Sequence, residues 1–268
     1  FLHTSRARNK TYEYTFDINQ PFKGQSKSFY ILGDENFKLT TISFDDNQGL
    51  ICLQSKEVPP DRISLIPDQF VNPAPIPQAI QDVVEANLQN DFKHSAISDF
   101  LFRKKPRFLT GPKNPILEPN LPPKEFIKSI ILAANDLDNS YLCIQGPPGA
   151  GKTFTARNVI GDLMSKGKRV GISSNSHKAI VNLMDGVADH LIENNIAGNL
   201  IKIGGSEEDS IFDKKNVFFK RDAKAVGDDF NNTSICVGGT AWLFCNSLLT
   251  EQEGIKKFDY LFIDEAGQ

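Results

Sequence analysis

The sequence has little cysteine, no long apolar run and no excess of basic charge, and each shortage excludes a class of protein. Its four cysteines are spread over 268 residues without a CxxC pair, which rules out a disulfide framework and argues against a structural zinc or iron–sulfur site. No apolar run approaches the roughly 18 residues that a membrane-spanning helix needs. With 30 basic and 33 acidic side chains, nucleic acid could bind only at a local patch.

The remaining composition is that of an ordinary globular protein. Hydrophobic residues make up 40% and charged residues 24% of the chain, whose length allows one large domain or two smaller ones. The first residues show neither an initiator methionine nor the basic-then-apolar pattern of a secretory signal. We therefore expect a reducing, cytoplasmic setting and no membrane partner.

The first 75 residues have the pattern of β-structure. Candidate strands at Phe37–Phe44 and Leu50–Gln54 flank a polar turn that contains Gly49, which predicts a hairpin within a small barrel or sandwich. A candidate helix follows over Gln78–Asn90, with Ile80, Val83, Val84 and Leu88 on one side. Residues 106–123 are rich in proline, which is typical of a linker.

From residue 124 onward the pattern alternates between strand and helix. Short apolar strands are expected at Tyr141–Gln145, Val170–Ser174, Ser234–Gly238 and Tyr260–Ile263. Between them, apolar residues recur at helical spacing, as in Ala156, Val159, Ile160, Leu163 and Met164, and again in Ile180, Leu183, Met184, Val187 and Leu191. This predicts an α/β fold: a parallel sheet with helices on both faces. Residues 205–231 mix charges without a period and are predicted to form a surface loop.

One motif predicts a phosphate-binding loop. It fits GxxxxGK[ST] and follows a predicted strand: Gly146, Pro147, Pro148, Gly149, Ala150, Gly151, Lys152 and Thr153. Its glycines let the backbone amides turn toward phosphate oxygens, and the following helix dipole adds to that attraction. Lys152 would contact the β- and γ-phosphates, and the hydroxyl of Thr153 would ligate Mg²⁺.

A second motif supplies carboxylates at the end of a buried-type strand. Asp264 and Glu265 follow Tyr260–Ile263, where ligands of α/β sheets bind. Asp264 is expected to hold Mg²⁺, and Glu265 to orient and deprotonate the attacking water. The chain has neither the NKxD motif of GTPases nor the LSGGQ signature of ABC transporters. We therefore expect ATP as the nucleotide, with Mg²⁺.

These motifs, with DEAGQ at 264–268, resemble the superfamily 1 helicases, in the group of the nonsense-mediated decay helicase and the Okazaki-fragment nuclease-helicase. The stretches SNSHK at 174–178 and VGGTAW at 237–242 look like that group's motifs Ia and Ic. Together the four motifs are most similar to bacterial proteins that fuse a RecB-like nuclease to this helicase core. The resemblance implies a RecA-like ATP-binding domain over 124–268, incomplete at its C-terminus. It implies a β-barrel subdomain over 1–75 and a helical stalk with linker over 76–123.

The resemblance also implies roles for individual residues. Gln268 would sense the γ-phosphate, beside Lys152, Asp264 and Glu265 in catalysis. The candidates for backbone contacts to a single strand, DNA rather than RNA, are Asn175, His177, Lys178 and Thr240. The implied enzyme is an ATP hydrolase that travels 5′-to-3′ as a helicase, with any nuclease domain upstream in a longer parent chain.

Two departures from the family pattern limit what the resemblance implies. The glutamine that reads adenine upstream of the P-loop has no counterpart between Lys124 and Asn139, so selectivity for adenine is less secure than phosphate binding. Motif III, the second RecA-like lobe and its arginine finger are also absent. We therefore expect a piece of a longer protein that alone binds nucleotide, hydrolyses it weakly and does not unwind duplexes.

Three readings stay open at this stage. The chain belongs to a helicase, to a P-loop ATPase without unwinding activity, or to a nucleotide-gated nucleic-acid-binding module. Two weaker features have ordinary explanations. The basic run Arg103, Lys104, Lys105 and Arg107 is expected to be a solvated surface, although it would neutralise phosphates if it faced the same groove. Trp242 is expected to be buried in the core rather than stacked on a base.

Overall fold

The computed structural model describes residues 9–19, 26–68, 72–89, 95–118, 120–147, 149–224, 234–246, 249 and 258–265. The chain divides into two compact units, Phe1–Asn72 and Pro73–Gln268. Pro148 of the P-loop and Gln268 lie outside the described residues. No helix among the described residues has the length and apolar character needed to cross a membrane.

The first unit is a five-stranded antiparallel sheet in the order β1-β4-β3-β2-β5. Its strands are β1 Lys10–Thr15, β2 Ser28–Ile31, β3 Asp34–Asp45, β4 Leu50–Ser55 and β5 Leu65–Pro67. Alternate residues of the central strands point into a small core built on Phe29, Leu39, Ile51 and Leu53. The predicted hairpin is confirmed as β3 and β4. Gly49 closes it at φ +63, where an added Cβ would lie 2.5 Å from the carbonyl oxygen of Phe16.

In the described part of the second unit, three helices precede the P-loop. These are α1 Ile76–Leu88, α2 Ala96–Leu101 and α3 Pro123–Asn135. Proline suits the first turn of α3 because the amide it lacks would have no partner within the helix. The apolar side expected on the first helix is present in α1, but none of its members is buried, and Leu88 is 75% exposed.

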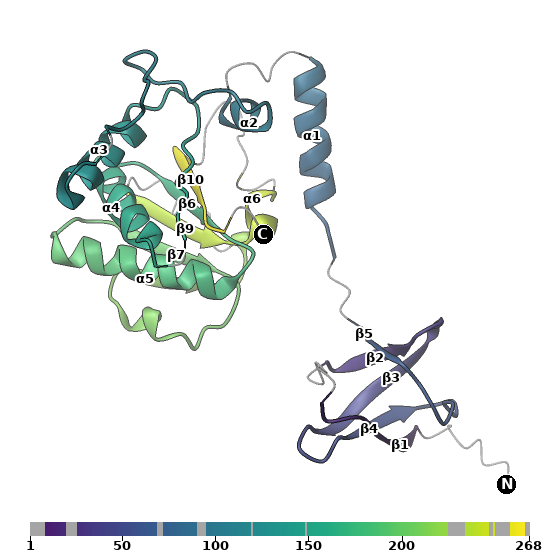
Figure 1. Cartoon of the computed structure of the whole chain (residues 1–268). Coiled ribbons are helices and arrows are strands. Elements are labelled where there is room, and N and C mark those ends of the chain that lie inside the picture. The colour runs from purple at the N-terminus through teal and green to yellow at the C-terminus, as the bar shows by residue number, and fades with distance from the viewer. Residues whose placement is uncertain are drawn as a thin grey trace, which may run out of the picture. The chain divides into compact units, whose positions relative to one another are not determined.

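A five-stranded parallel sheet forms the centre of this unit, in the order β10-β6-β9-β7-β8. Its strands are β6 Val170–Ser173, β7 Asn199–Ile203, β8 Val217–Lys220, β9 Ile235–Gly239 and β10 Tyr260–Ile263. The other elements are α4 Lys152–Ser165, α5 His177–Glu193, the short 3-10 helix η1 Ser210–Asp213 and α6 Ala241–Phe244. Figure 1 shows α4 and α5 on one face of the sheet and α6 on the other.

Strand alternation assigns each apolar residue to one of two cores. Leu200 and Cys236 pack into the larger core with α4 and α5. Their neighbours Ile201, Ile235 and Val237 pack into the smaller core beside α6. This two-sided burial confirms the predicted α/β class, a parallel sheet covered by helices.

Two predictions of secondary structure are wrong in this unit. Tyr141–Gln145 forms no strand in the described chain, because an apolar run becomes a strand only when a neighbour supplies ladder hydrogen bonds. The stretch 205–231 is not simply a surface loop, since it contains η1 and β8. Val217 of β8 is 4% exposed and is anchored by its pairing with Leu200 of β7.

Candidate nucleotide and nucleic-acid site

The P-loop bends where its glycines allow it. Gly149 has φ +79 and Gly151 has φ +81, a left-handed conformation that other L-residues adopt only with strain. Gly151 is the N-cap of α4, so the helix begins at Lys152 immediately after this bend. The free amides of the first turn of α4 therefore open toward the loop, as anion binding requires.

Lys152 folds back over the same loop. Its Nζ donates hydrogen bonds to the carbonyl oxygens of Gly146, at 2.7 Å, and Pro147, at 3.1 Å. The loop is drawn in further by the amide of Ala150, which donates to Pro147 at 3.1 Å. Thr153 follows Lys152 and is exposed. A cationic amine and a hydroxyl are thus presented beside free amides, which is the chemistry that a nucleotide phosphate needs.

The chain path places this loop at the carboxyl edge of the sheet. Helix α4 packs against β6, and only four residues lie between the end of α4 and the start of β6, so the helix runs back along the strand from the strand's carboxyl end. The first turn of α4 must therefore lie near the carboxyl ends of the strands. Helix α5 begins at this edge as well, because only three residues separate it from the end of β6. Ligands of open α/β sheets bind at this edge.

Asp264 and Glu265 come to the same edge from β10. The amide of Asp264 donates to the carbonyl of Ser173 at 2.8 Å, which ties the residue to the end of β6. The amide of Glu265 donates to the carboxylate of Asp264 at 3.0 Å, and Glu265 itself is exposed with φ +55. The two carboxylates thus leave the sheet at a sharp turn directly after a parallel strand.

The donor set at this edge fits Mg²⁺. That ion prefers oxygen ligands and is commonly held by one or two protein groups together with phosphate oxygens and water. Thr153 supplies a hydroxyl from the first turn of α4, and Asp264 supplies a carboxylate directly after β10. Both of these segments reach this edge of the sheet. Among the described residues no cluster of three or more His, Cys, Asp or Glu side chains forms a self-sufficient metal site. The residues therefore suit an ion that arrives with a nucleotide.

The four candidate nucleic-acid residues follow two neighbouring strands. Asn175, His177 and Lys178 follow β6 and are exposed, and Thr240 follows β9 as the N-cap of α6. Since β6 and β9 pair directly, these groups belong to one stretch of the edge. Ser176 caps α5, its Oγ accepting from the amide of Ala179 at 3.4 Å.

One aromatic residue and one charged residue differ from what the sequence led us to expect. Trp242 is 38% exposed in the first turn of α6, so the prediction of a buried indole is wrong. The four-residue α6 is too short to cover so large a side chain on every side. Lys202 was not anticipated: it is 1% exposed in β7, and its Nζ lies 2.9 Å from Nδ1 of His177. The signal for it was a single charge among the apolar residues Leu200, Ile201 and Ile203.

Part of the basic run near residue 105 lies against a buried carboxylate. Asp99 is 1% exposed, and its carboxylate lies 3.2 Å from Nη2 of Arg107 and 4.0 Å from Nζ of Lys104. Ser140 donates to the same carboxylate at 2.7 Å. Because Ser140 directly precedes Tyr141, this buried cluster anchors the segment that leads into the P-loop. The expectation of a wholly solvated basic surface is therefore wrong for Arg107.

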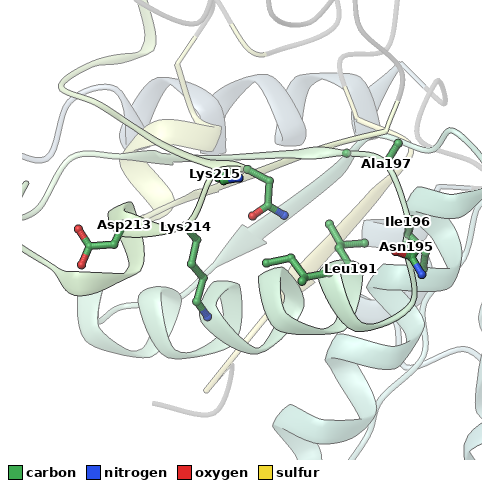
Figure 2. A pocket seen from close by; sticks show the side chains of 10 residues that line it. Leu191, Asn195, Ile196, Ala197, Asp213, Lys214 and Lys215 are labelled. Carbon is green, nitrogen blue, oxygen red and sulfur yellow. The ribbon is translucent and has the colours of Figure 1, made fainter.

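One cavity lies away from this edge. Its volume is about 610 Å³, and it is lined by the end of α5, the loop before β7 and the segment between η1 and β8 (Figure 2). Lys214 at its margin is held by Asp185 and Asp189, at 2.5 and 2.6 Å. Because α5 starts at the carboxyl edge, the residues after its end lie toward the opposite edge. This cavity is therefore separate from the P-loop.

Two comparisons with known proteins bear on this region. The AAA domain family matches residues 125–226, which include the P-loop and end after β8. The protein named "DNA replication ATP-dependent helicase/nuclease DNA2" from Saccharomyces cerevisiae is 33% identical to this chain over 153 residues. That alignment covers 56% of this chain and 9% of the yeast protein. The chain thus spans less than a tenth of the length of the curated relative that it matches.

Proposed function

We propose that this chain carries an ATP-dependent helicase-type domain of superfamily 1, which hydrolyses ATP to move along a single strand of nucleic acid; the match to the AAA domain family and the identity to the yeast helicase/nuclease support this proposal. The observation that carries the proposal is the P-loop itself. Gly149 and Gly151 bend it, Lys152 lies over it, and it opens onto the first turn of α4. The yeast relative's name supports DNA rather than RNA as the track.

Each residue of the nucleotide site has a distinct task in this proposal. Lys152 exchanges its loop carbonyls for the β- and γ-phosphates, and the loop amides donate to the same oxygens. Thr153 and Asp264 would hold Mg²⁺, and the ion would supply positive charge against the charge that develops on the phosphates. Glu265 positions a water and accepts its proton, a task that suits an exposed carboxylate at a strand end. Gln268, outside the described residues, would link the γ-phosphate to the strand.

The track is assigned to the stretch of edge beyond β6 and β9. Asn175, His177, Lys178 and Thr240 offer amide, imidazole, ammonium and hydroxyl donors to the sugar–phosphate backbone, so binding would depend on salt more than on sequence. Trp242 lies two residues beyond Thr240, and its exposure favours a role in stacking on a base of the strand. A nuclease, as in the name of the yeast relative, would lie outside this chain.

The nucleotide site is tested by binding of ATP and Mg²⁺ to the 268-residue chain. Lys152→Ala removes an ammonium hydrogen-bonded to phosphate, so we expect affinity to fall about 10- to 150-fold, the equivalent of about 1.5–3 kcal/mol. Lys215→Ala is the charge-matched control, because Lys215 is exposed beside the separate cavity. Equal affinity in the wild type and Lys152→Ala would remove the P-loop from the proposal.

The motor function is tested by ATP hydrolysis with and without oligo(dT) or oligo(rU). We expect slow turnover by this chain, stimulated by one polymer and lost in Glu265→Gln, and no duplex separation. If a polymer stimulates ATP hydrolysis but a longer parent protein does not translocate along that polymer, the result would favour the ATPase that does not unwind. Nucleic-acid affinity that follows bound ATP but is unchanged by Glu265→Gln would favour the gated binding module.

A further inference from the structure

Lys202 is a buried charge whose hydrogen bonds are complete. Its side chain lies in β7 at 1% exposure, and its Nζ donates to the carbonyls of Ile203, at 2.8 Å, and Gly204, at 2.6 Å. The remaining contact is to Nδ1 of His177, at 2.9 Å. A lysine ammonium has three donors, and here each has one acceptor. Burying an ammonium is costly even when it is hydrogen-bonded, so this arrangement calls for a reason.

His177 is held on its other side by a glycine turn. Gly204 and Gly205 follow β7 with φ +67 and +87, and the imidazole lies against them. A Cβ at Gly205 would lie 3.1 Å from both Cγ and Nδ1 of His177, so a larger residue would displace the ring. The histidine is nevertheless exposed overall, at the first position of α5. One edge of the ring is therefore fixed against Lys202 while the residue as a whole remains open to solvent.

The contact with Lys202 determines where the imidazole carries its proton. An ammonium has no lone pair, so Nδ1 must accept, and in the neutral ring the proton is then on Nε2. Burial lowers the pKa of Lys202 to about 8, although the negative charge of Asp209 opposes this shift. With that pKa, Lys202 is still mainly charged at pH 7. Burial, and then the charge of Lys202, lowers the pKa of His177, which favours the neutral ring.

We propose that Lys202 is a positioning residue that fixes His177 as the Nε2–H tautomer, so that His177 donates to a phosphate oxygen of bound single-stranded DNA. The inference rests on the proposed function, because it uses the same track. It adds to that function a residue that never touches the strand. A neutral donor at a fixed position contacts each passing phosphate without the tight ion pair that a free lysine would form, which suits a strand that must slide.

Selective ¹⁵N-histidine labelling tests the tautomer directly. The chain has four histidines, and His177→Ala identifies the resonances of the ring in question. At pH 7 we expect the His177 ring to have a protonated Nε2 and a bare Nδ1 in the wild type. Lys202→Met should shift that ring toward a mixture of tautomers. A wild-type ring protonated at Nδ1 overturns the proposal, and this measurement needs no variant of Lys202 to fold.

A double-mutant cycle on dT₂₀ affinity tests the link to the strand. We expect Lys202→Met and His177→Ala each to weaken binding about fivefold, the usual size for one hydrogen bond, with no further loss in the double variant. Lys215→Met, which also removes one charge, should leave affinity unchanged. Independent, multiplying losses would overturn the inference and leave the proposed function standing. A wild-type chain that binds no dT₂₀ would overturn both.

Discussion

At the scale of single residues, the P-loop depends on backbone freedom more than on side-chain contacts. Gly151 has open space around its missing Cβ, so only its φ of +81 restricts what can replace it. We expect Gly151→Ala to cost about 1–2 kcal/mol of stability. We also expect it to weaken ATP binding, because relief of the strain would turn the first amides of α4 away from the phosphates. Urea unfolding and nucleotide titration measure the two effects.

Gly111→Ala is the matched control for that substitution. Gly111 has φ +100 and equally open surroundings, and it belongs to the same unit, but it lies far from the P-loop in sequence. It should lose a similar amount of stability and keep the wild-type affinity for ATP. If both variants bind ATP as the wild type does, the left-handed conformation of Gly151 is only structural.

At the scale of elements, an ion pair joins the beginnings of two strands. Asp259 precedes β10 and accepts from the amide of Arg169 at 2.8 Å and from its Nε at 3.3 Å, beside the start of β6. Burial alone would raise the pKa of Asp259, but the hydrogen bonds from Arg169 outweigh it and lower the pKa. We expect Asp259→Asn to destabilise this unit by about 1 kcal/mol at pH 7.

The pH dependence of that difference follows from the lowered pKa. A carboxylate whose pKa falls on folding stabilises the protein above its unfolded pKa, about 3.9, and loses that contribution as pH falls through the folded value. The gap between the wild type and Asp259→Asn should therefore close below about pH 4. Trp242, the one tryptophan, lies in this unit and reports its unfolding by fluorescence. If the stability difference stays constant down to pH 2, or if Asp138→Asn shows the same difference from the wild type, the effect does not come from the pair of Asp259 and Arg169.

The elements that could be predicted from the sequence are those with a strong local signal. The apolar faces of α4 and α5 were predicted residue by residue, since burial against one sheet face imposes a helical period. The strands β2, β5, β7 and β8 were missed, whereas β6, β9 and β10, which have only four or five residues themselves, were predicted, so length does not explain the difference. Tyr141–Gln145 was predicted to be a strand and is not one. Apolar composition does not reveal which neighbouring strand would supply the hydrogen bonds of a sheet.

The candidate site divides in the same way. Lys152, Thr153, Asp264 and Glu265 could be named because their spacing from glycines and strands is local in sequence, although their roles remain predictions. Lys202 could not be assigned, since its partner His177 is 25 residues away and meets it only through the pairing of β6, β9 and β7. The commitment of Arg107 to Asp99 was likewise hidden, because a basic run does not reveal a carboxylate buried beneath it.

At the scale of the whole molecule, two units with separate cores imply separate stabilities. The core of the first unit is small, and its largest fully buried side chain is Phe29, at 0% exposure. The second unit has its own two cores on either side of the parallel sheet. In the part of the chain that the structure describes, each of these cores is built from residues of its own unit. A lesion in the first core should therefore leave the nucleotide site intact.

Phe29→Ala tests this independence in the full chain. Removing a buried phenyl ring costs about 3–5 kcal/mol, which is comparable with the whole stability of so small a unit. We expect a calorimetric transition for Phe1–Asn72 to move to lower temperature or vanish, while the Trp242 midpoint and the affinity for ATP stay at wild-type values. Val237→Ala, in the core beside α6, should have the reverse effect. If Phe29→Ala lowers the Trp242 midpoint or weakens ATP binding, the two units do not unfold independently, and the prediction of separate stabilities is wrong.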